Sequence, residues 1–311
     1  MELISKSAVA RSCGKAILLG EHAVVYGVPA LVAGLEQGAS AVARASSDPI
    51  LTVGERTARA SDETDLGKAF KALLDALGGV GHEVTVTLEL PPGAGLGASA
   101  AIAVAAARAV LEVHSGAAAD VERVIEGAMA WERVFHGNPS GVDAWASAHG
   151  GCFSFVRGSG RKPVFVSRAM TLAICVAGPP ASTRLMVEGV ARLRDRRPEV
   201  VQKTFDGIES LVRNAALCVE AGDLPGLGKL LDLNQMLLAG LFLSTPEIER
   251  ACALAREAGA LGAKLTGSGG GGSVIALTDG NAEPVLESWR SNGLECFASV
   301  VKTAQSTEQS R

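Results

Sequence analysis

The sequence predicts an α+β protein with two domains. The chain has 311 residues, which suffices for one large domain or two ordinary ones. Hydrophobic residues make up 48% and charged residues 20%, so there is enough apolar material for a core. Strands that read as hairpins alternate with helical segments, and a new strand begins close to residue 170. We therefore expect an N-terminal domain over residues 1–170 and a C-terminal α+β domain over 171–311.

The first elements follow from hydrophobic spacing. Residues 15–27 are typical of a strand that runs into a loop, and residues 62–77 of a helix. Residues 82–90 alternate, with Val and Leu on one face and Thr and Glu on the other, which predicts a half-buried strand. Pro91 and Pro92 end it, because proline cannot donate a hydrogen bond to the ladder.

Residues 99–114 are strongly helical in composition, and Gly116 stops that helix. Further along the chain, a helix is expected over residues 120–134, a hairpin over 151–158 and 162–167, and a buried strand over 170–178. Helical segments are expected over 182–222, 225–239 and 246–259, and two closing strands over 272–279 and 296–303. Aromatic residues are only 4% of the chain, so the core is expected to consist mainly of Ala, Val and Leu.

Charge and cysteine usage exclude several classes. The net charge is −4 and no basic block stands out, which argues against nucleic-acid binding. None of the six cysteines forms a C-x-x-C pair, which favours reduced thiols in the cytoplasm. The first 15 residues lack the apolar region of a signal peptide. Residues 90–107 are uncharged, but Pro, Gly and Ala dominate them and Arg108 follows, so we expect no membrane span and no membrane partner.

The segment "PPGAGLGAS", residues 91–99, predicts a strand, a Gly-rich turn and a helix in succession. Backbone N–H groups of such a turn and of a helix start bind anions. The segment also fits the G-x-G-x-x-G/A pattern of dinucleotide folds through Gly93, Gly95 and Ala98, with Glu112 near the place of a ribose-binding acid. An NAD(P) oxidoreductase is therefore an alternative. Against it, the preceding strand is half polar, unlike the buried strands of a parallel sheet.

Three other segments carry candidate chemistry. "GKAILLGEHAVVYG" (14–27) places Lys15, Glu21 and His22 in an apolar run, although a solvated strand end is the alternative. "WERVFHGNPSGVDAW" (131–145) contains Glu132 near a predicted helix end, where the helix dipole disfavours an acid. It also contains Asp143, for which Lys15 is the expected partner, because a buried carboxylate needs one. In "AKLTGSGGGGSVIAL" (263–277) five glycines stand together, which indicates close backbone approach or a flexible hairpin loop.

These segments, in this order, resemble the signatures of the mevalonate kinase family, in the superfamily that also holds galactokinase, homoserine kinase and phosphomevalonate kinase. The resemblance extends from Gly14 to Ser273. Within the superfamily, the resemblance to the mevalonate kinase branch rests mainly on "GEHAVVYG" and "HGNPSGVD". It implies a two-domain small-molecule kinase fold with the active site in the interdomain cleft and the N-terminal domain, residues 1–170, binding ATP and substrate. It also implies a left-handed βαβ crossover in the N-terminal half, against the usual rule. The implied reaction is ATP-dependent phosphorylation of the primary hydroxyl of mevalonate to 5-phosphomevalonate, in isoprenoid precursor synthesis.

The resemblance also implies roles for single residues. Asp143 matches the catalytic aspartate and Lys15 the lysine beside it, both at the substrate hydroxyl. Ser99 and Glu132 match the Mg²⁺ ligands. One departure is visible, since many family members have two serines after "GLG" where this chain has Ala98 and Ser99. The loop implied to wrap the ATP phosphates is Pro92, Gly93, Ala94, Gly95, Leu96, Gly97, Ala98 and Ser99. The positions implied to meet the substrate are Lys15, Glu21, His22, Asp143, Thr183, Gly267 and Gly269.

Such a site suits phosphoryl transfer, which needs positioning and charge neutralisation more than covalent chemistry. Three alternatives stay open beside mevalonate: another small alcohol or isoprenoid precursor as substrate, a non-catalytic ligand sensor on the same fold, and the oxidoreductase. A sensor is expected to lose Lys15, Asp143 or the acid that holds Mg²⁺, and all three are present. The sequence leaves the oligomeric state open, and a homodimer is compatible with it.

Overall fold

The computed structural model describes residues 7–137, 139–179 and 181–303. Asn138 of the "HGNPSGVD" segment and the first six residues, part of the stretch searched for a signal peptide, lie outside the described residues. The chain forms two compact units. Unit 1 contains the chain up to Lys15, Gln37–Pro92 and Gly97–Gly150, and unit 2 contains Ala16–Glu36, Gly93–Leu96 and the chain from Gly151 onward. A division at residue 170 stays a prediction.

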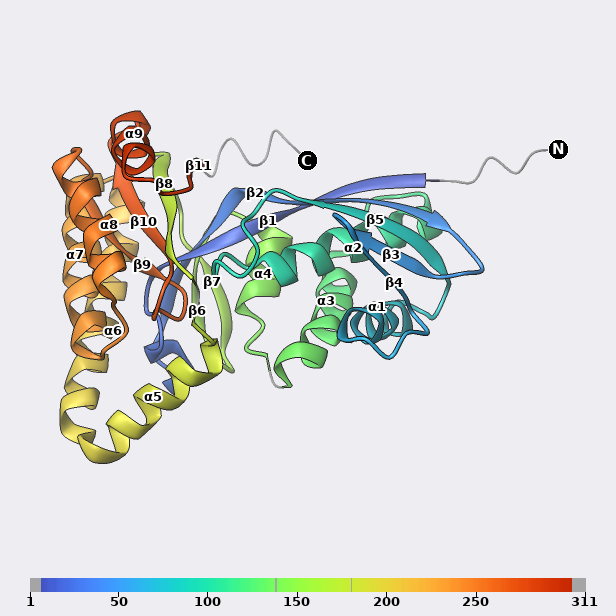
Figure 1. Cartoon of the computed structure of the whole chain (residues 1–311), viewed down its shortest axis with the longest axis horizontal. Helices are drawn as coiled ribbons and strands as arrows, with labels where there is room; N and C mark the ends of the chain where they lie inside the picture. Colours follow the sequence, from blue (N-terminus) through green and yellow to red (C-terminus); the bar gives the residue numbers. More distant parts are fainter. Residues whose placement is uncertain (1–6, 138, 180, 304–311) are drawn as a thin grey trace. The chain divides into compact units, whose positions relative to one another are not determined.

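Unit 1 consists of a sheet and four helices (Figure 1). The sheet order is β4-β3-β5-β2, with β1 also paired to β2, and β3 runs parallel to β5. Helix α2 packs on β5, α3 and α4, so it forms the centre of the unit. The strands are β1 (Ser7–Leu19), β2 (Ala30–Ala45), β3 (Ile50–Val53), β4 (Arg56–Arg59) and β5 (His82–Leu88). The helices are α1 (Asp65–Ala76), α2 (Ala98–Ser115), α3 (Val121–His136) and α4 (Val142–His149).

Unit 2 carries the last parts of β1 and the first parts of β2, where β6 pairs with Ala30–Ala33. Its second sheet has the order β11-β8-β10-β9 and is antiparallel throughout. Figure 1 shows α6, α7 and α8 beside this sheet, and α8 contacts three of its strands. The strands are β6 (Cys152–Val156), β7 (Gly160–Pro163), β8 (Met170–Gly178), β9 (Gly262–Thr266), β10 (Gly272–Thr278) and β11 (Cys296–Val301). The helices are η1 (Ala23–Tyr26, 3-10), α5 (Thr183–Arg196), α6 (Pro198–Ala221), α7 (Leu224–Gly240), α8 (Pro246–Glu257) and α9 (Glu283–Ser291).

Most expected elements are confirmed, with two kinds of difference. The helical segment expected over residues 182–222 divides at Arg197, because Pro198 has no N–H to continue α5 and instead begins α6. The second strand of the predicted hairpin ends at Pro163. Other elements have no counterpart among those expected, namely β2, β3, β4, β9, η1, α4 and α9.

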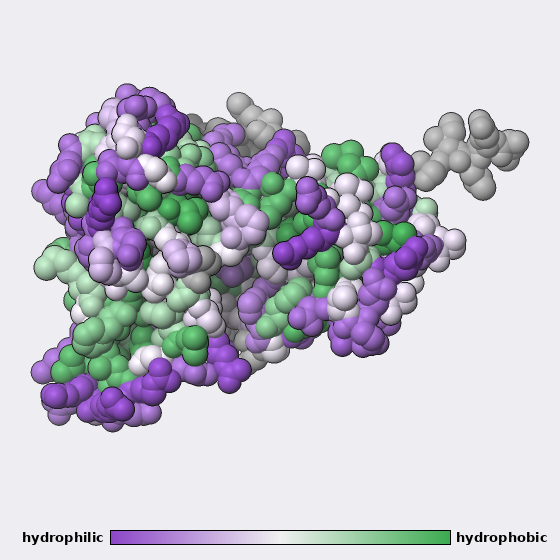
Figure 2. Space-filling model, viewed as in Figure 1, coloured by the Kyte–Doolittle hydropathy of each residue, from purple (hydrophilic) through white to green (hydrophobic). Residues whose placement is uncertain are grey.

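The core is built mainly from Ala, Val and Leu, as the composition predicts. Helix α2 shows why the low aromatic content suffices, since its Ala side chains are almost all buried and let neighbouring elements approach closely. This helix is long and apolar enough to cross a membrane by length and composition, but 61% of it is buried inside the protein. It is therefore the core helix of unit 1. In Figure 2, apolar surface gathers over the helical layer of unit 2, above a hydrophilic edge at the α5–α6 connection.

Candidate active site

Lys15 and Asp143 form an ion pair inside unit 1. The Lys15 Nζ and Asp143 Oδ1 atoms are 3.2 Å apart, and the two side chains are 6% and 38% exposed. Lys15 comes from the buried part of β1, and Asp143 from the first turn of α4, where the helix dipole favours an acid. Asp143 Oδ1 is itself buried and receives no hydrogen bond from the described residues. The contact is therefore an ion pair by distance without hydrogen-bond geometry, and this oxygen can still accept a hydrogen bond from a donor.

Ser99 and Glu132 meet beside this pair. The Ser99 hydroxyl donates to Glu132 Oε1 at 2.5 Å and accepts a bond from Trp131 Nε1 at 3.1 Å. Glu132 lies in the last turn of α3 and is only 4% exposed. Burial raises the pKa of its carboxyl, the bond from Ser99 opposes that rise, and the negative charge of Asp143 adds to it. Thus four elements of unit 1, namely β1, α2, α3 and α4, bring together the residues that the sequence predicts for the substrate hydroxyl and Mg²⁺.

The start of α2 completes this arrangement. The N-cap of the helix is Gly97, whose φ of +77° places it in the left-handed region. The first intrahelical bond runs from Ala101 N to Gly97 O, so the N–H groups of residues 98–100 have no partner within the helix. A Cβ added to Gly97 would lie 3.0 Å from Lys15 Cγ. The helix start therefore offers backbone donors for an anion next to the Lys15 side chain.

Replacing Gly97 with Val is expected to abolish ATP binding. The added side chain would force a strained φ and press on Lys15 at the proposed phosphate cradle. The measurement is the KM for ATP together with the melting temperature. Gly54→Val is the control, because Gly54 also has a positive φ (+57°) but no atom within 4 Å of an added Cβ. An unchanged KM for ATP in Gly97→Val would contradict the cradle.

The preceding residues of the loop, Gly93–Leu96, belong to unit 2. The Ala94 and Leu96 side chains are buried, so only the backbone of these residues is available to a ligand. Ser273 Oγ donates to Ala94 O at 2.8 Å. A Cβ on Gly267 would lie 3.4 Å from Gly95 O. The β9–β10 loop therefore contacts the Gly-rich loop through backbone atoms, and the φ of +90° at Gly267 is the reason why glycine is favoured there.

Glu21 lies in the interior of unit 2. Its side chain and that of Lys264 on β9 are both fully buried, and they form a charge-assisted hydrogen bond. Asn234 Nδ2 of α7 donates to the second Glu21 oxygen at 3.2 Å. Burial raises the pKa of Glu21, and Lys264 opposes that rise. Both carboxylate oxygens of Glu21 therefore accept hydrogen bonds from protein side chains.

His22 follows in a strained backbone conformation, with φ +60° and ψ −46°. Its Nε2 lies 2.8 Å from Ser268 O, and because a carbonyl only accepts, Nε2 donates. Burial lowers the pKa of His22, which favours the neutral ring. Thr183, at the exposed start of α5, makes a long contact of 3.4 Å from Oγ1 to Ser268 Oγ. His22 and Thr183 are therefore gathered around the β9–β10 loop that contains Gly267 and Gly269.

Sequence reasoning singled out none of Trp131, Asn234, Lys264 and Ser273. Lys264 lies inside the quoted "AKLTGSGGGG" segment, where a lysine in a strand of otherwise apolar residues was an available signal. Trp131 directly precedes Glu132, but its bond to Ser99 depends on how α2 and α3 pack. Asn234 lies in a helix far along the chain, and no local pattern connects it to Glu21.

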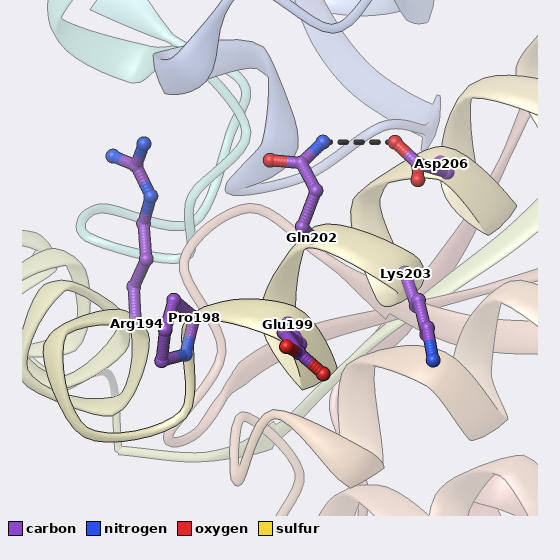
Figure 3. A pocket seen from close by; sticks show the side chains of 6 residues that line it. All are labelled: Arg194, Pro198, Glu199, Gln202, Lys203 and Asp206. Atoms are coloured by element: carbon purple, nitrogen blue, oxygen red, sulfur yellow. Dashed lines mark hydrogen bonds between the residues drawn. The ribbon is translucent and has the colours of Figure 1, made fainter.

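The pair of Ser99 and Glu132 fits Mg²⁺, because both offer oxygen ligands that already converge within hydrogen-bond distance. Among the described residues no three His, Cys, Asp or Glu side chains form a metal-binding group. Mg²⁺ usually takes one or two protein oxygens and completes its shell with water and substrate phosphates, so two ligands suffice. A separate pocket at the α5–α6 connection is lined by charged and polar side chains, among them Gln202 and Asp206 joined by a 2.8 Å hydrogen bond (Figure 3). It contains none of the predicted site residues.

Comparisons with known proteins show which family the chain is similar to. The family model "GHMP kinases N terminal domain" matches residues 65–151, and "GHMP kinases C terminal" matches residues 214–294. A mevalonate kinase of Aeropyrum pernix is 33% identical over 95% of this chain and 96% of its own length. The mevalonate kinase of Archaeoglobus fulgidus is 34% identical over 88% of this chain and 93% of its own length. The crystal structure of L. major mevalonate kinase in complex with R-mevalonate superposes with a TM-score of 0.86 at 28% identity, covering 96% of this chain and 97% of that one. Since identity above 30% extends over nearly the whole length of both chains, the protein belongs to the mevalonate kinase family of the GHMP kinases.

Proposed function

We propose that the protein transfers a phosphoryl group from ATP to the primary hydroxyl of mevalonate, giving 5-phosphomevalonate for isoprenoid precursor synthesis. The observation that carries this proposal is the cluster in unit 1, where the Lys15–Asp143 ion pair adjoins Ser99 and Glu132 at the start of α2. The choice of mevalonate is supported by the names of the relatives and by the mevalonate bound to the L. major enzyme.

ATP binding is assigned to the Gly-rich loop. The backbone N–H groups of residues 98–100 have no partner within the helix and are suited to the oxygens of a bound phosphate. The helix dipole adds a positive potential at the same place. Ala94 and Leu96 keep the loop in shape by burying their side chains.

Ser99 and Glu132 would hold Mg²⁺ together with the nucleotide. When bound, the ion supplies positive charge that neutralises phosphate oxygens. The protein's own part is to keep two oxygens converged: the Trp131 indole fixes the Ser99 hydroxyl, and helix α3 fixes Glu132.

Asp143 would orient the substrate hydroxyl and accept its proton through its carboxylate, since the side chain is 38% exposed while its buried Oδ1 faces Lys15. Lys15, 3.2 Å away, places a positive charge beside that carboxylate and close to the helix start where phosphate is expected. In unit 2, His22, Thr183, Gly267 and Gly269 around Ser268 would contact the substrate or the phosphates. Because none of its six cysteines, all of them among the described residues, forms a disulfide, the enzyme is inferred to act in the cytoplasm.

The test is an assay of ADP release with ATP and Mg²⁺ across mevalonate, phosphomevalonate, homoserine and galactose. We expect turnover with mevalonate to exceed that with the other three. Turnover with another alcohol alone would assign the protein to a different kinase reaction. ATP binding without ADP release from any of them would favour a ligand sensor, and binding of NAD(P)H in place of ATP would favour the oxidoreductase.

A further inference from the structure

We propose that Glu21 is a positioning residue, whose carboxylate acts through Lys264 and Asn234 to hold the Gly267–Gly270 segment of the β9–β10 loop in place. This inference rests on the proposed function for its kinetic part, since the loop is the one to which we assign contact with substrate or phosphate. It replaces direct contact between Glu21 and substrate, which the sequence alone suggests, with an indirect role.

Burial is the first support. The Glu21 and Lys264 side chains have no exposed surface, and both Glu21 oxygens are engaged, one by Lys264 Nζ and the other by Asn234 Nδ2. Because the side chain has no exposed surface, a substrate hydroxyl could reach this carboxylate only after the residues around it moved. Removing two charges from water is also expensive, and apolar side chains of similar volume could replace such a pair at little loss of stability, so stability alone does not account for it.

Connectivity is the second support. Glu21 stands in the turn that follows β1, directly before His22, while Lys264 stands in β9 three residues before Gly267. Lys264 Nζ also donates to Leu265 O. Leu265 N donates to the Gln235 amide oxygen at 2.9 Å, next to Asn234 on α7. The ion pair thus connects the turn after β1 with β9 and, through Asn234, with α7, next to the start of the β9–β10 loop.

Further hydrogen bonds attach β9 and the β9–β10 loop to the residues on both sides of Glu21 in the chain. His22 Nε2 donates to Ser268 O, and Thr266 Oγ1 both accepts from Ile17 N at 2.9 Å and donates to Ile17 O at 3.1 Å. The side chains of Lys264 and Thr266 in β9 and the carbonyl of Ser268 in the loop are thereby attached to the segment Ile17–His22, which contains Glu21. Five residues from Gly267 to Gly271, four of them glycine, have little stiffness of their own. Their position is therefore set by these contacts together with the bond from Gly270 N to Leu243 O at 2.8 Å.

The experiment compares wild type, Glu21→Gln, Lys264→Met and the double variant Glu21→Gln/Lys264→Met. Each single variant leaves one buried charge without its counter-charge. The double variant is a neutral pair of similar shape, in which the amide oxygen introduced at position 21 still accepts from Asn234. The control is Glu283→Gln, which removes the exposed Glu283–Arg290 ion pair at 2.6 Å on α9 of the same unit. The readouts are kcat, the KM values for mevalonate and ATP, melting temperature, and amide hydrogen exchange of residues 264–272 by mass spectrometry.

We expect kcat per folded molecule to fall about 10- to 100-fold in each single variant, the scale of a misplaced supporting group. The KM for mevalonate should stay near wild type, exchange in 264–272 should accelerate, and the double variant should recover most of both losses. If a single variant does not fold, the double variant decides.

Direct contact between Glu21 and substrate predicts that the double variant stays impaired, with a raised KM for mevalonate, and that outcome overturns the proposal. A lower melting temperature with unchanged kcat and unchanged exchange overturns it as well. If wild type does not turn over mevalonate, the proposed function fails, while the exchange data still test the positioning role.

Discussion

Asp143→Asn will lower kcat by about 10²- to 10⁴-fold, the usual contribution of a general base, with little change in ATP affinity. The acceptor is a primary alcohol, which does not lose its proton readily, so a fixed carboxylate oxygen is useful while the O–P bond forms. Asn keeps the shape of Asp143 but cannot accept the proton. The measurement is kcat and KM for both substrates, with the melting temperature determined on the same samples.

The partner and the control make this result specific. Lys15→Met should lower kcat too, and the double variant should lose less than the product of the single losses, since the two residues act as a unit. Glu89→Gln is the matched control, because it removes the Arg11–Glu89 ion pair at 2.6 Å, which also involves β1 in unit 1. If Lys15 and Asp143 only fasten β1 to α4, both single variants will lose thermal stability and keep kcat in the folded fraction.

Glu132→Gln will raise the Mg²⁺ concentration needed for half-maximal activity at least about 10- to 100-fold, the range seen even when only outer-shell partners of metal ligands are removed. The introduced amide can still accept the bond from Ser99, so the fold should persist, but the negative charge is lost. The check is a Mg²⁺ titration of activity at fixed ATP. Glu126→Gln, on the exposed side of the same helix, should behave as wild type. Wild-type activity of Glu132→Gln across the titration would refute the metal role.

The same carboxyl should make the Mg²⁺ requirement depend on pH. Burial raises the pKa of Glu132, so on acidification it takes up a proton at a higher pH than an exposed glutamate does. A proton and Mg²⁺ compete for the same oxygen. Half-maximal activity should therefore need more Mg²⁺ as the pH falls through this raised pKa, and Glu132→Gln should lack that pH dependence.

The sequence by itself determined the elements whose signal is local. Alternation over residues 82–90, the proline pair that ends that strand and the Ala-rich run from residue 99 predicted β5, the turn and α2, because each depends on side chains close in the chain. The four motif segments predicted the candidate residues and the family. The anion-binding start of α2 also follows from sequence, since glycine at residue 97 permits the left-handed N-cap.

Only the tertiary structure decided what depends on packing between distant segments. Strand β2 is rich in Ala and Gly and has weak strand propensity, so its pairing with β5 and β6 imposes its conformation. Glu21 and Asp143 look alike in sequence, each an acid in a polar turn next to an apolar run. In the folded chain Asp143 keeps 38% of its side chain exposed beside Lys15, whereas Glu21 is sealed between Lys264 and Asn234, more than 200 residues away. The burial of a side chain depends on neighbours contributed by the whole fold. Only the tertiary structure therefore distinguishes a carboxylate that can contact a substrate from one that has a structural role.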